Sequence, residues 1–304
     1  MRILHMTDVH FYRPVTGVRG ALGKRGLGLA NLHLRGRVHH FDADALVQRA
    51  VADAVGQEAD LFVMTGDLSA LSQDSEFAAA RAAFSPLLES MPSVVIPGNH
   101  DRYTRGAARE HRMETHFGPW MRGGNWADGG WDGPPIPAGR SAPFPGVSRL
   151  GDVAVVSTDP CRPGLSADGR FGEPQIEAVR GAIAQARADG LQVVLLTHYP
   201  LVWGDGTPYR RKGHCLQDLD GMLAALTAEP PDLVLHGHKH EFWQTELRLG
   251  DRRVPSLNCG TTSAVSPLDD RTAGYCIYEL TGGELRSVRR RVLVAGEDAW
   301  RDAA

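Results

Sequence analysis

Short apolar segments rich in Val, Ile and Leu alternate along this chain with longer segments of helical periodicity. This alternation is typical of layered α/β domains, in which helices cover sheets. We expect strands at Arg2–Met6, Leu61–Thr65, Ser93–Pro97, Val153–Ser157, Gln192–Thr197 and Leu233–His236. We expect helices at Ala43–Glu58, Asp74–Glu89, Glu173–Ala188 and Leu216–Ala228.

The pattern changes after residue 240, where shorter strands are predicted to pair antiparallel. They lie at Gln244–Leu249, Val254–Leu257, Gly274–Leu280 and Leu285–Val294. No repeat of fixed period is present, and 304 residues with 42% apolar composition can bury a full core. We interpret residues 1–304 as a single domain with a Gly/Pro/Trp-rich loop at about 117–145. Residues 294–304 are expected to form a loosely attached tail.

Cysteine spacing and hydropathy exclude several classes of protein. The four cysteines are far apart and form no C-x-x-C pair, so they indicate neither a thiolate zinc site nor a disulfide framework. The first residues, Met1–Met6, show no apolar segment behind a basic one, and no window approaches the roughly 18 to 20 apolar residues of a membrane span. We therefore expect a cytoplasmic protein.

Five short polar clusters stand where predicted strands end. They are Asp8-Val-His10, Gly66-Asp67, Gly98-Asn99-His100-Asp101, His198, and Gly237-His238-Lys239-His240. In an extended backbone, residues two apart project to the same side, so the first and last clusters can each direct two side chains to one point. The glycines permit the tight turns and close backbone approach that a crowded site requires.

The side chains of these clusters form a nitrogen and oxygen donor set without sulfur. Such a set favours Mn, Fe, Zn or Co over Cu(I), and it is too rich in imidazole for Ca or Mg. Its members are Asp8, His10, Asp67, Asn99, His198, His238 and His240. Because seven ligands exceed what one such ion takes from a protein, the sequence predicts two ions that share a carboxylate.

The order D-x-H, G-D, G-N-H-D, H, G-H-x-H resembles the calcineurin-like metallophosphoesterase superfamily, and it spans most of the chain from Asp8 to His240. The resemblance implies a four-layer α/β/β/α sandwich of two mixed sheets. It places one ion on Asp8, His10 and His240 and the other on Asn99, His198 and His238, with Asp67 bridging them. It implies two divalent or mixed-valence ions, such as Mn²⁺, Fe²⁺/Fe³⁺ or Zn²⁺.

The same resemblance assigns catalytic roles to two neighbouring residues. His100 matches the residue that contacts the phosphate or protonates the leaving oxygen, and Asp101 matches the carboxylate that orients it. One departure is Ala70, because many relatives carry a polar or charged residue there. Two cations about 3.5 to 4 Å apart would lower the pKa of a bridging water, so that a bridging hydroxide attacks phosphorus.

Within the superfamily, the G-N-H-D block with His198 and the last cluster is similar to class III cyclic nucleotide phosphodiesterases. We therefore expect hydrolysis of small phosphodiesters such as 3',5'-cyclic nucleotides. One alternative is a UDP-2,3-diacylglucosamine-type pyrophosphate hydrolase or a broad phosphomonoesterase, although the position of His100 is often Arg in the former. A non-catalytic metal-binding scaffold is an alternative of another class.

A basic, amphipathic insertion at about 13–41 follows the first cluster. No acid occurs from Val9 to Phe41, whereas Arg35 and Arg37 are among its six Arg and Lys residues. One interpretation is an amphipathic helix packed on the core. The other is a segment over the site, in which Arg35 and Arg37 bind an anionic substrate and the leucines contact a lipid-linked one.

The overall charge argues against general binding to nucleic acids. All 36 acidic residues lie outside the basic insertion, and the formal net charge is -3. We expect a small anionic phosphoester as the partner, and the sequence leaves the oligomeric state open, a dimer included. The remaining histidines are expected to be structural or solvated, and His236 is a candidate to support the site from behind.

Overall fold

The computed structural model describes residues 1–15, 26, 41–121, 124–125, 144–164, 166–294 and 299–303. The strands are β1 Arg2–Met6, β2 Leu61–Met64, β3 Ser93–Val95, β4 Gly124–Asn125, β5 Gly146–Leu150, β6 Val153–Ser157, β7 Gln192–Leu196, β8 Leu233–His236, β9 Phe242–Leu249, β10 Arg252–Cys259, β11 Gly274–Thr281, β12 Glu284–Leu293 and β13 Trp300–Asp302. The α-helices are α2 Ala43–Val55, α3 Asp74–Leu88, α4 Arg105–Arg109, α5 Arg112–Phe117, α6 Glu173–Ala188 and α7 Leu219–Ala228, and a 3-10 helix covers Gly118–Trp120.

These strands form two mixed sheets. The first has the order β13-β12-β11-β1-β2-β3, in which β1, β2 and β3 are parallel and β11 runs antiparallel to β1. The second has the order β4-β5-β6-β7-β8-β10-β9, in which β6, β7, β8 and β10 are parallel neighbours. Short parallel strands joined by helices are what the alternating sequence pattern predicted.

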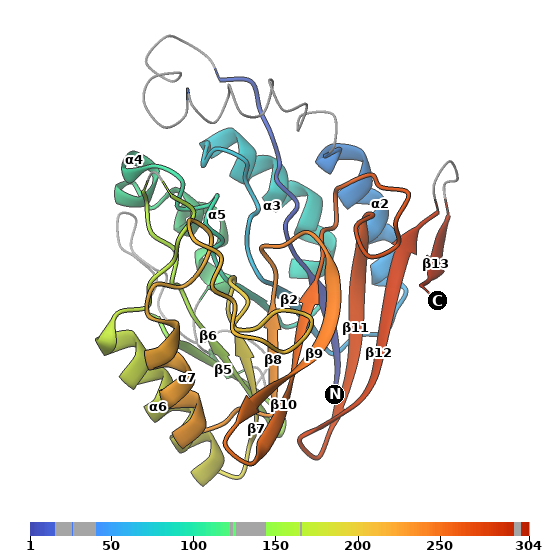
Figure 1. The fold of residues 1–304 in the computed structure, drawn as a ribbon. Helices are drawn as coiled ribbons and strands as arrows, with labels where there is room; N and C mark the ends of the chain where they lie inside the picture. Colours follow the sequence, from blue (N-terminus) through green and yellow to red (C-terminus); the bar gives the residue numbers. More distant parts are fainter. Residues whose placement is uncertain are drawn as a thin grey trace.

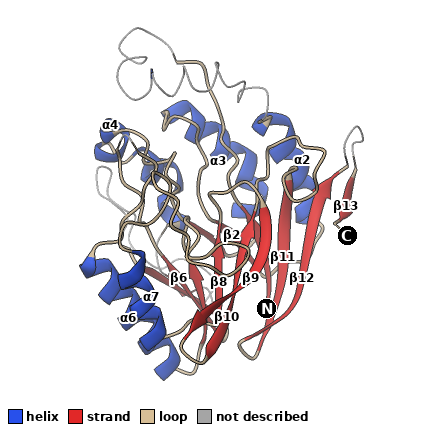
Figure 2. Ribbon diagram, in the orientation of Figure 1, coloured by secondary structure: helices blue, strands red, loops and turns tan. Residues whose placement is uncertain are grey.

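The two sheets pack face to face, and helices cover their outer faces (Figures 1 and 2). Helices α2 and α3 bury Val47, Val51, Phe77 and Phe84 against the first sheet. Helices α6 and α7 do the same on the second sheet. Between the sheets lies a third apolar layer of Val, Ile and Leu from both. The chain therefore has the predicted four-layer α/β/β/α architecture.

Most predicted elements are confirmed to within a few residues. The strands β1, β6 and β8 and the helix α6 have the predicted bounds. Helix α7 begins at Leu219 rather than at Leu216, because Leu216 forms a bridge with Gly169. The carboxylate of Asp218 accepts hydrogen bonds from the backbone N–H groups of Phe171 and Gly172, which keeps this residue outside the helix.

Two parts of the chain differ from the sequence predictions. The expectation of a loosely attached tail is wrong for β13, which pairs with β12, and Trp300 packs against the core beside Tyr275. The short elements α4, α5 and β5 were not predicted. Most of the 13–41 insertion and of the 117–145 loop lies outside the described residues, so both remain predictions.

Parallel strands bring all five polar clusters to one region. The first three clusters follow the carboxyl ends of β1, β2 and β3, which are neighbours in the first sheet. The last two follow β7 and β8, which are neighbours in the second sheet. Because the carboxyl ends of parallel strands meet at one edge, the loops from both sheets face each other there.

A buried ion cluster anchors the loop that follows β3. Arg102 is 6% exposed and donates to the carboxylates of Glu114 in α5 and Asp159 after β6, at N···O distances of 2.9 and 3.0 Å. Both acids are also buried. Arg102 therefore fixes the loop of Asn99 and His100 to two other parts of the chain.

We expect Arg102→Met to destabilise the fold by about 3 to 5 kcal/mol, because it leaves two buried carboxylates without their cation. Denaturation by urea, followed by circular dichroism, measures the change. The control Arg253→Ala removes an arginine of an exposed ion pair on β10, and its midpoint should match the wild type. Equal midpoints for all three proteins would contradict the anchoring role.

Candidate metal centre

The first ligand group gathers at the end of β1. The side chains of Asp8, His10, Asp67 and His240 each offer one ligand atom, and these atoms all lie within 4.8 Å of one another. The Nε2 atoms of His10 and His240 are 2.9 Å apart, and His240 Nε2 lies 3.1 Å from Asp8 Oδ1. The structure thus brings together the residues predicted for one ion.

The second group lies beside the first. Asn99 Oδ1 is 3.1 Å from His198 Nε2 and 2.9 Å from His238 Nδ1, and the two imidazole nitrogens are 3.3 Å apart. The side chains of His198 and Asn99 are buried. The structure therefore also brings together the three residues predicted for the other ion.

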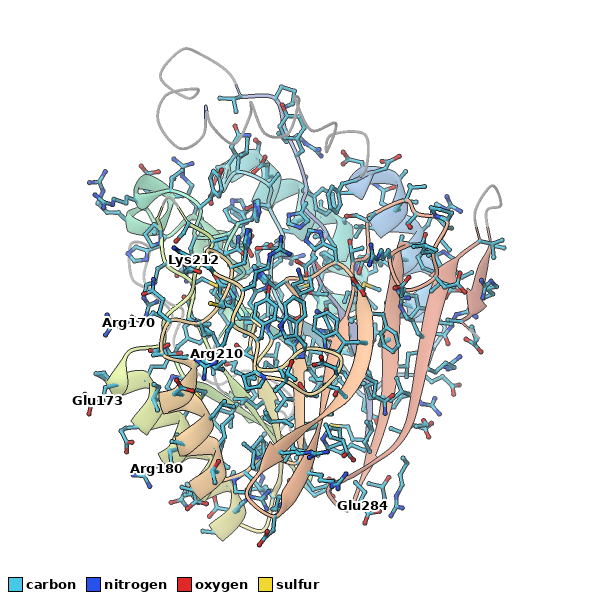
Figure 3. All side chains as sticks on the ribbon, viewed as in Figure 1. Arg170, Glu173, Arg180, Arg210, Lys212 and Glu284 are labelled. Carbon is cyan, nitrogen blue, oxygen red and sulfur yellow. The ribbon has the colours of Figure 1, made fainter. Side chains whose placement is uncertain are left out.

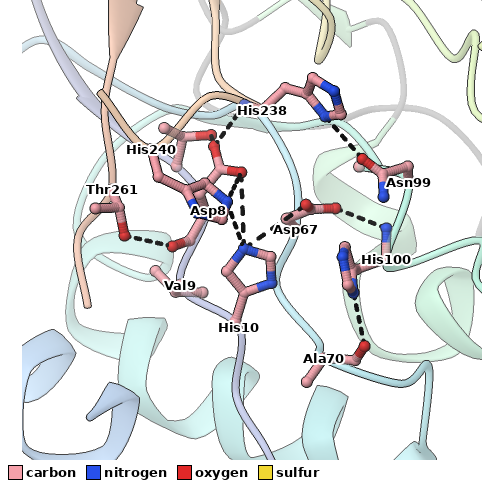
Figure 4. A network of polar contacts seen from close by, with 12 residues as sticks. Asp8, Val9, His10, Asp67, Ala70, Asn99, His100, His238, His240 and Thr261 are labelled. Atoms are coloured by element: carbon pink, nitrogen blue, oxygen red, sulfur yellow. Dashed lines mark hydrogen bonds and ion pairs between the residues drawn. The ribbon is translucent and has the colours of Figure 1, made fainter. Parts of the chain in front are cut away.

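Asp67 connects the two groups (Figure 4). Its Oδ2 atom lies 3.8 Å from His10 Nε2 in the first group and 3.5 Å from His198 Nε2 in the second. Its Oδ1 atom accepts a hydrogen bond of 2.7 Å from the backbone N–H of His100. One oxygen of the carboxylate is thus held by the protein while the other faces both groups, as a bridging ligand requires.

These distances fit ligands that surround metal ions. Ligand atoms about 2.1 Å from one ion lie about 3 Å apart at right angles and about 4 Å apart on opposite sides. Asp8 supplies a separate observation. Its Oδ2 accepts hydrogen bonds from Thr7 Oγ1 and His238 N, whereas its Oδ1 is buried, forms no hydrogen bond and faces His240 Nε2 at 3.1 Å. Since a buried carboxylate oxygen without a hydrogen bond is costly, the residues fit a bound cation.

Backbone carbonyls fix the tautomers of two imidazoles. His198 Nδ1 donates to Thr65 O at 2.8 Å, and His238 Nε2 donates to His214 O at 3.0 Å. A carbonyl oxygen only accepts, so the proton of each neutral ring lies on that nitrogen. The lone pairs of His198 Nε2 and His238 Nδ1 then face Asn99 Oδ1, as metal-ligating histidines require.

The local backbone corrects our expectation of extended segments. Positive φ angles occur at Asp8 (53°), His10 (51°), Asp67 (57°), His238 (76°) and His240 (51°). Each is in the left-handed region, which non-glycine residues adopt at a cost of about 1 kcal/mol or more. The paired side chains therefore converge because the chain turns sharply after each strand, not because residues two apart share a face of a strand.

Glycines allow the turns to touch, as the sequence indicated. A Cβ atom on Gly98 would overlap the backbone nitrogen and the Oδ1 atom of Asp67. A Cβ atom on Gly237 would overlap Thr7 Oγ1 and Asp8 Oδ2. Close backbone approach between the strand ends is thus required at both positions.

The imidazole of His100 lies against the first ligand group. It meets the His10 ring edge to face at 4.8 Å between centroids, and it stacks on Tyr103 at 5.4 Å. Its Nδ1 donates to Ala70 O at 2.7 Å, so a backbone carbonyl orients the ring at the position where many relatives use a polar side chain. The departure at Ala70 therefore does not leave His100 unsupported.

Asp101 has a different position from the one expected. Its carboxylate accepts from the backbone N–H groups of Leu68, Ser69 and Gly98, at 3.2, 2.9 and 2.9 Å. It thus joins the loop after β2 to the loop after β3, while Ala70 O holds the His100 ring. Burial and the charge of Asp67 raise the pKa of Asp101 to about 7.

The electrostatics of the centre favour positive charge. Burial raises the pKa of Asp67, but the charges of His198, His100 and His10 hold it well below the ordinary value. Burial also lowers the pKa of His198, yet Asp67 and Asp8 raise it to about 9. The two carboxylates thus create a negative field deep in the protein, which a cation can neutralise.

Most other described histidines have structural partners, as expected. His5 bonds to Tyr278 and Thr65 in the layer between the sheets, and burial lowers its pKa to about 3. His116 bonds to Asp74. His236 bonds to Ser256 and contacts Trp243, and no direct bond from it to a ligand side chain is found among the described residues. Arg35 and Arg37 lie outside the described residues.

The sequence did not indicate several groups that support the ligands. They are the backbone carbonyls of Thr65, Ala70 and His214 and the hydroxyl of Thr7. A backbone carbonyl leaves no mark on the amino-acid sequence, so no signal could have identified the first three. Thr7 precedes Asp8 directly, which is a weak signal.

The four-layer fold and the adjoining groups of Asp, His and Asn side chains are typical of one class of protein, the metal-dependent phosphoesterases. The family model for calcineurin-like phosphoesterases matches residues 1–242, and the chain belongs to this family. No curated protein sequence matches it significantly. The chain is therefore a metal-dependent phosphoesterase. In the described part of the chain, no helix has the length and hydropathy to cross a bilayer.

Solved structures support the fold at low sequence identity. A dimetal phosphatase from Danio rerio is 12% identical with a TM-score of 0.57, covering 95% of this chain and 94% of that one. The purple acid phosphatase PPD1 from yellow lupin is 13% identical with a TM-score of 0.58, covering 99% of this chain and 52% of that one. A 5'-nucleotidase precursor from Thermus thermophilus is 15% identical with a TM-score of 0.52, covering 95% and 53%.

We expect Gly98→Ala to weaken metal affinity by roughly 10- to 100-fold, because the new methyl group displaces Asp67. Metal analysis after dialysis against dilute Mn²⁺ measures the loss. The control Gly181→Ala lies in α6, where nothing is within 4 Å of the added Cβ, and should bind metal as the wild type does. Wild-type affinity in Gly98→Ala would contradict the contact.

Proposed function

We propose that this chain hydrolyses small phosphodiesters, with 3',5'-cyclic nucleotides among the candidate substrates, at a centre of two metal ions. The main observation in favour of this proposal is the position of Asp67 Oδ2 between the two ligand groups. His100 supports the assignment, because its ring lies against the first group and its Nδ1 is already bound to Ala70 O.

The ligand groups and His100 would have different roles in hydrolysis. When bound, the two ions would lower the pKa of water and neutralise charge on the phosphoryl group. His100 would hold a proton on Nε2 in its imidazolium form, since Nδ1 donates to the Ala70 carbonyl. It would give that proton to the departing oxygen, which general acids of this kind do with a gain of about 10² to 10⁴ in rate.

The choice of a diester over other esters rests on the sequence blocks. The resemblance of the Gly98–Asp101 block, with His198 and Gly237–His240, to class III phosphodiesterases favours it. Diacylglucosamine pyrophosphate hydrolases often carry Arg at the position of His100, so the imidazole counts against that alternative. All seven ligand positions and His100 are filled, which counts against a non-catalytic scaffold.

We expect purified protein with added Mn²⁺ to hydrolyse bis(p-nitrophenyl) phosphate, and Asp67→Asn to abolish the activity. The variant loses a negative charge and the shared ligand, so both ions should bind more weakly. Release of p-nitrophenolate and metal analysis measure the two effects. A wild type no faster than Asp67→Asn would favour the scaffold, and normal metal content in the variant would contradict the bridging role.

For His100→Ala, we expect a loss that depends on the leaving group. Turnover of diphenyl phosphate should fall by about 10² to 10⁴, and that of bis(p-nitrophenyl) phosphate should fall much less, because nitrophenolate leaves without a proton. Metal content should remain that of the wild type. Equal losses for the two esters would argue against acid catalysis by His100.

A further inference from the structure

Lys239 stands between two ligands of different ions. Its neighbours in sequence are His238 of the second group and His240 of the first. The residue is half-buried, and no ion pair of its ammonium group is found among the described residues. The backbone on either side of Lys239 therefore belongs to residues of both ligand groups.

Aromatic rings hold the Lys239 side chain in place. Its Nζ lies 5.3 Å from the ring centroid of Trp203 and 5.9 Å from that of Tyr209. These two rings are 4.5 Å apart, and Tyr209 is fully buried. A cation over aromatic faces is attracted without being neutralised, so these two rings leave the charge of Lys239 available to another anion.

Trp203 and Tyr209 belong to the connection between β7 and α7, which also carries further positive charge. Arg211 and Lys212 are exposed, and neither forms an ion pair with a described residue, whereas the neighbouring Arg210 pairs with Asp220. Figure 3 labels Arg210 and Lys212 on this connection. Tyr209, two residues before Arg211, has its ring 5.9 Å from Lys239 Nζ, so this connection passes beside the Lys239 ammonium group. Cations on neighbouring segments that form no ion pair with a described residue favour a shared anion.

This connection is attached to the metal centre itself. The carbonyl of His214, at its end, accepts the hydrogen bond from His238 Nε2. The rings of Tyr209 and His238 meet at 6.3 Å. The acid nearest to Lys239 in sequence, Glu241, forms an ion pair with Arg271, with 3.0 Å between Glu241 Oε2 and Arg271 Nη2. The connection that carries Arg211 and Lys212 therefore lies beside His238, a ligand of the second group.

We propose that Lys239 and Arg211 form a subsite for a second negatively charged group of the substrate, apart from the phosphoryl group that is hydrolysed. This inference rests on the proposed phosphodiesterase function and narrows its substrates. Diesters that carry an additional phosphate or carboxylate on the retained portion are preferred over diesters with a single negative charge. Lys239 is a specificity residue, not a group that reacts.

Two nitrophenyl esters isolate the second charge. Thymidine 5'-(p-nitrophenyl phosphate) and its 3'-phosphorylated analogue share the nucleoside and the leaving group and differ only in the 3'-phosphate. We expect wild-type protein to prefer the 3'-phosphorylated ester and Lys239→Gln to lose roughly tenfold of that preference in kcat/KM, chiefly through KM. Lys239→Arg should retain it, and high salt should reduce it in the wild type.

Controls separate specificity from damage to the centre. The metal content of Lys239→Gln should equal that of the wild type, and Arg253→Gln on the exposed face of β10 should keep the wild-type preference. Equal losses for both esters in Lys239→Gln, or no preference in the wild type, would overturn the subsite while leaving the proposed function standing. Failure of the wild type to hydrolyse either ester would overturn both.

Discussion

The Asp67 carboxylate is the interaction on which the centre depends. One oxygen is held at 2.7 Å by the backbone N–H of His100, and the other faces His10 and His198 from the two ligand groups. The hydrogen bond holds the carboxylate in an orientation in which its other oxygen faces both groups. The same backbone N–H belongs to the residue proposed as the acid, so the position of the acid and the position of the bridge are coupled.

At the metal centre, the ligands lie on strained backbone turns that close packing holds in place. Five ligands adopt left-handed backbone conformations, and such strain persists only where surrounding contacts over-determine it. Here the Asp101 carboxylate accepts two backbone hydrogen bonds from the loop after β2 and one from its own loop after β3, and Arg102 binds the latter loop to α5. The layers of apolar side chains stabilise the fold, and this stability offsets the strain of the loops that position the ligands.

Much of this could be predicted from the sequence, because strand and helix periodicity mark the layers and the clusters stand at strand ends. The ligand set could also be predicted, since Asp, His and Asn side chains are visible in the sequence. The carbonyls of Ala70 and His214 could not, because any residue supplies one. The left-handed turns at Asp8 and His240 and the pairing of β13 depend on tertiary contacts that periodicity does not encode.

The most direct test of this account is anomalous diffraction from crystals of the protein grown with Mn²⁺. The account predicts two anomalous peaks about 3.5 to 4 Å apart, with Asp67 Oδ2 between them, Asp8, His10 and His240 around one, and Asn99, His198 and His238 around the other. A single peak, or peaks that do not share Asp67, would contradict it.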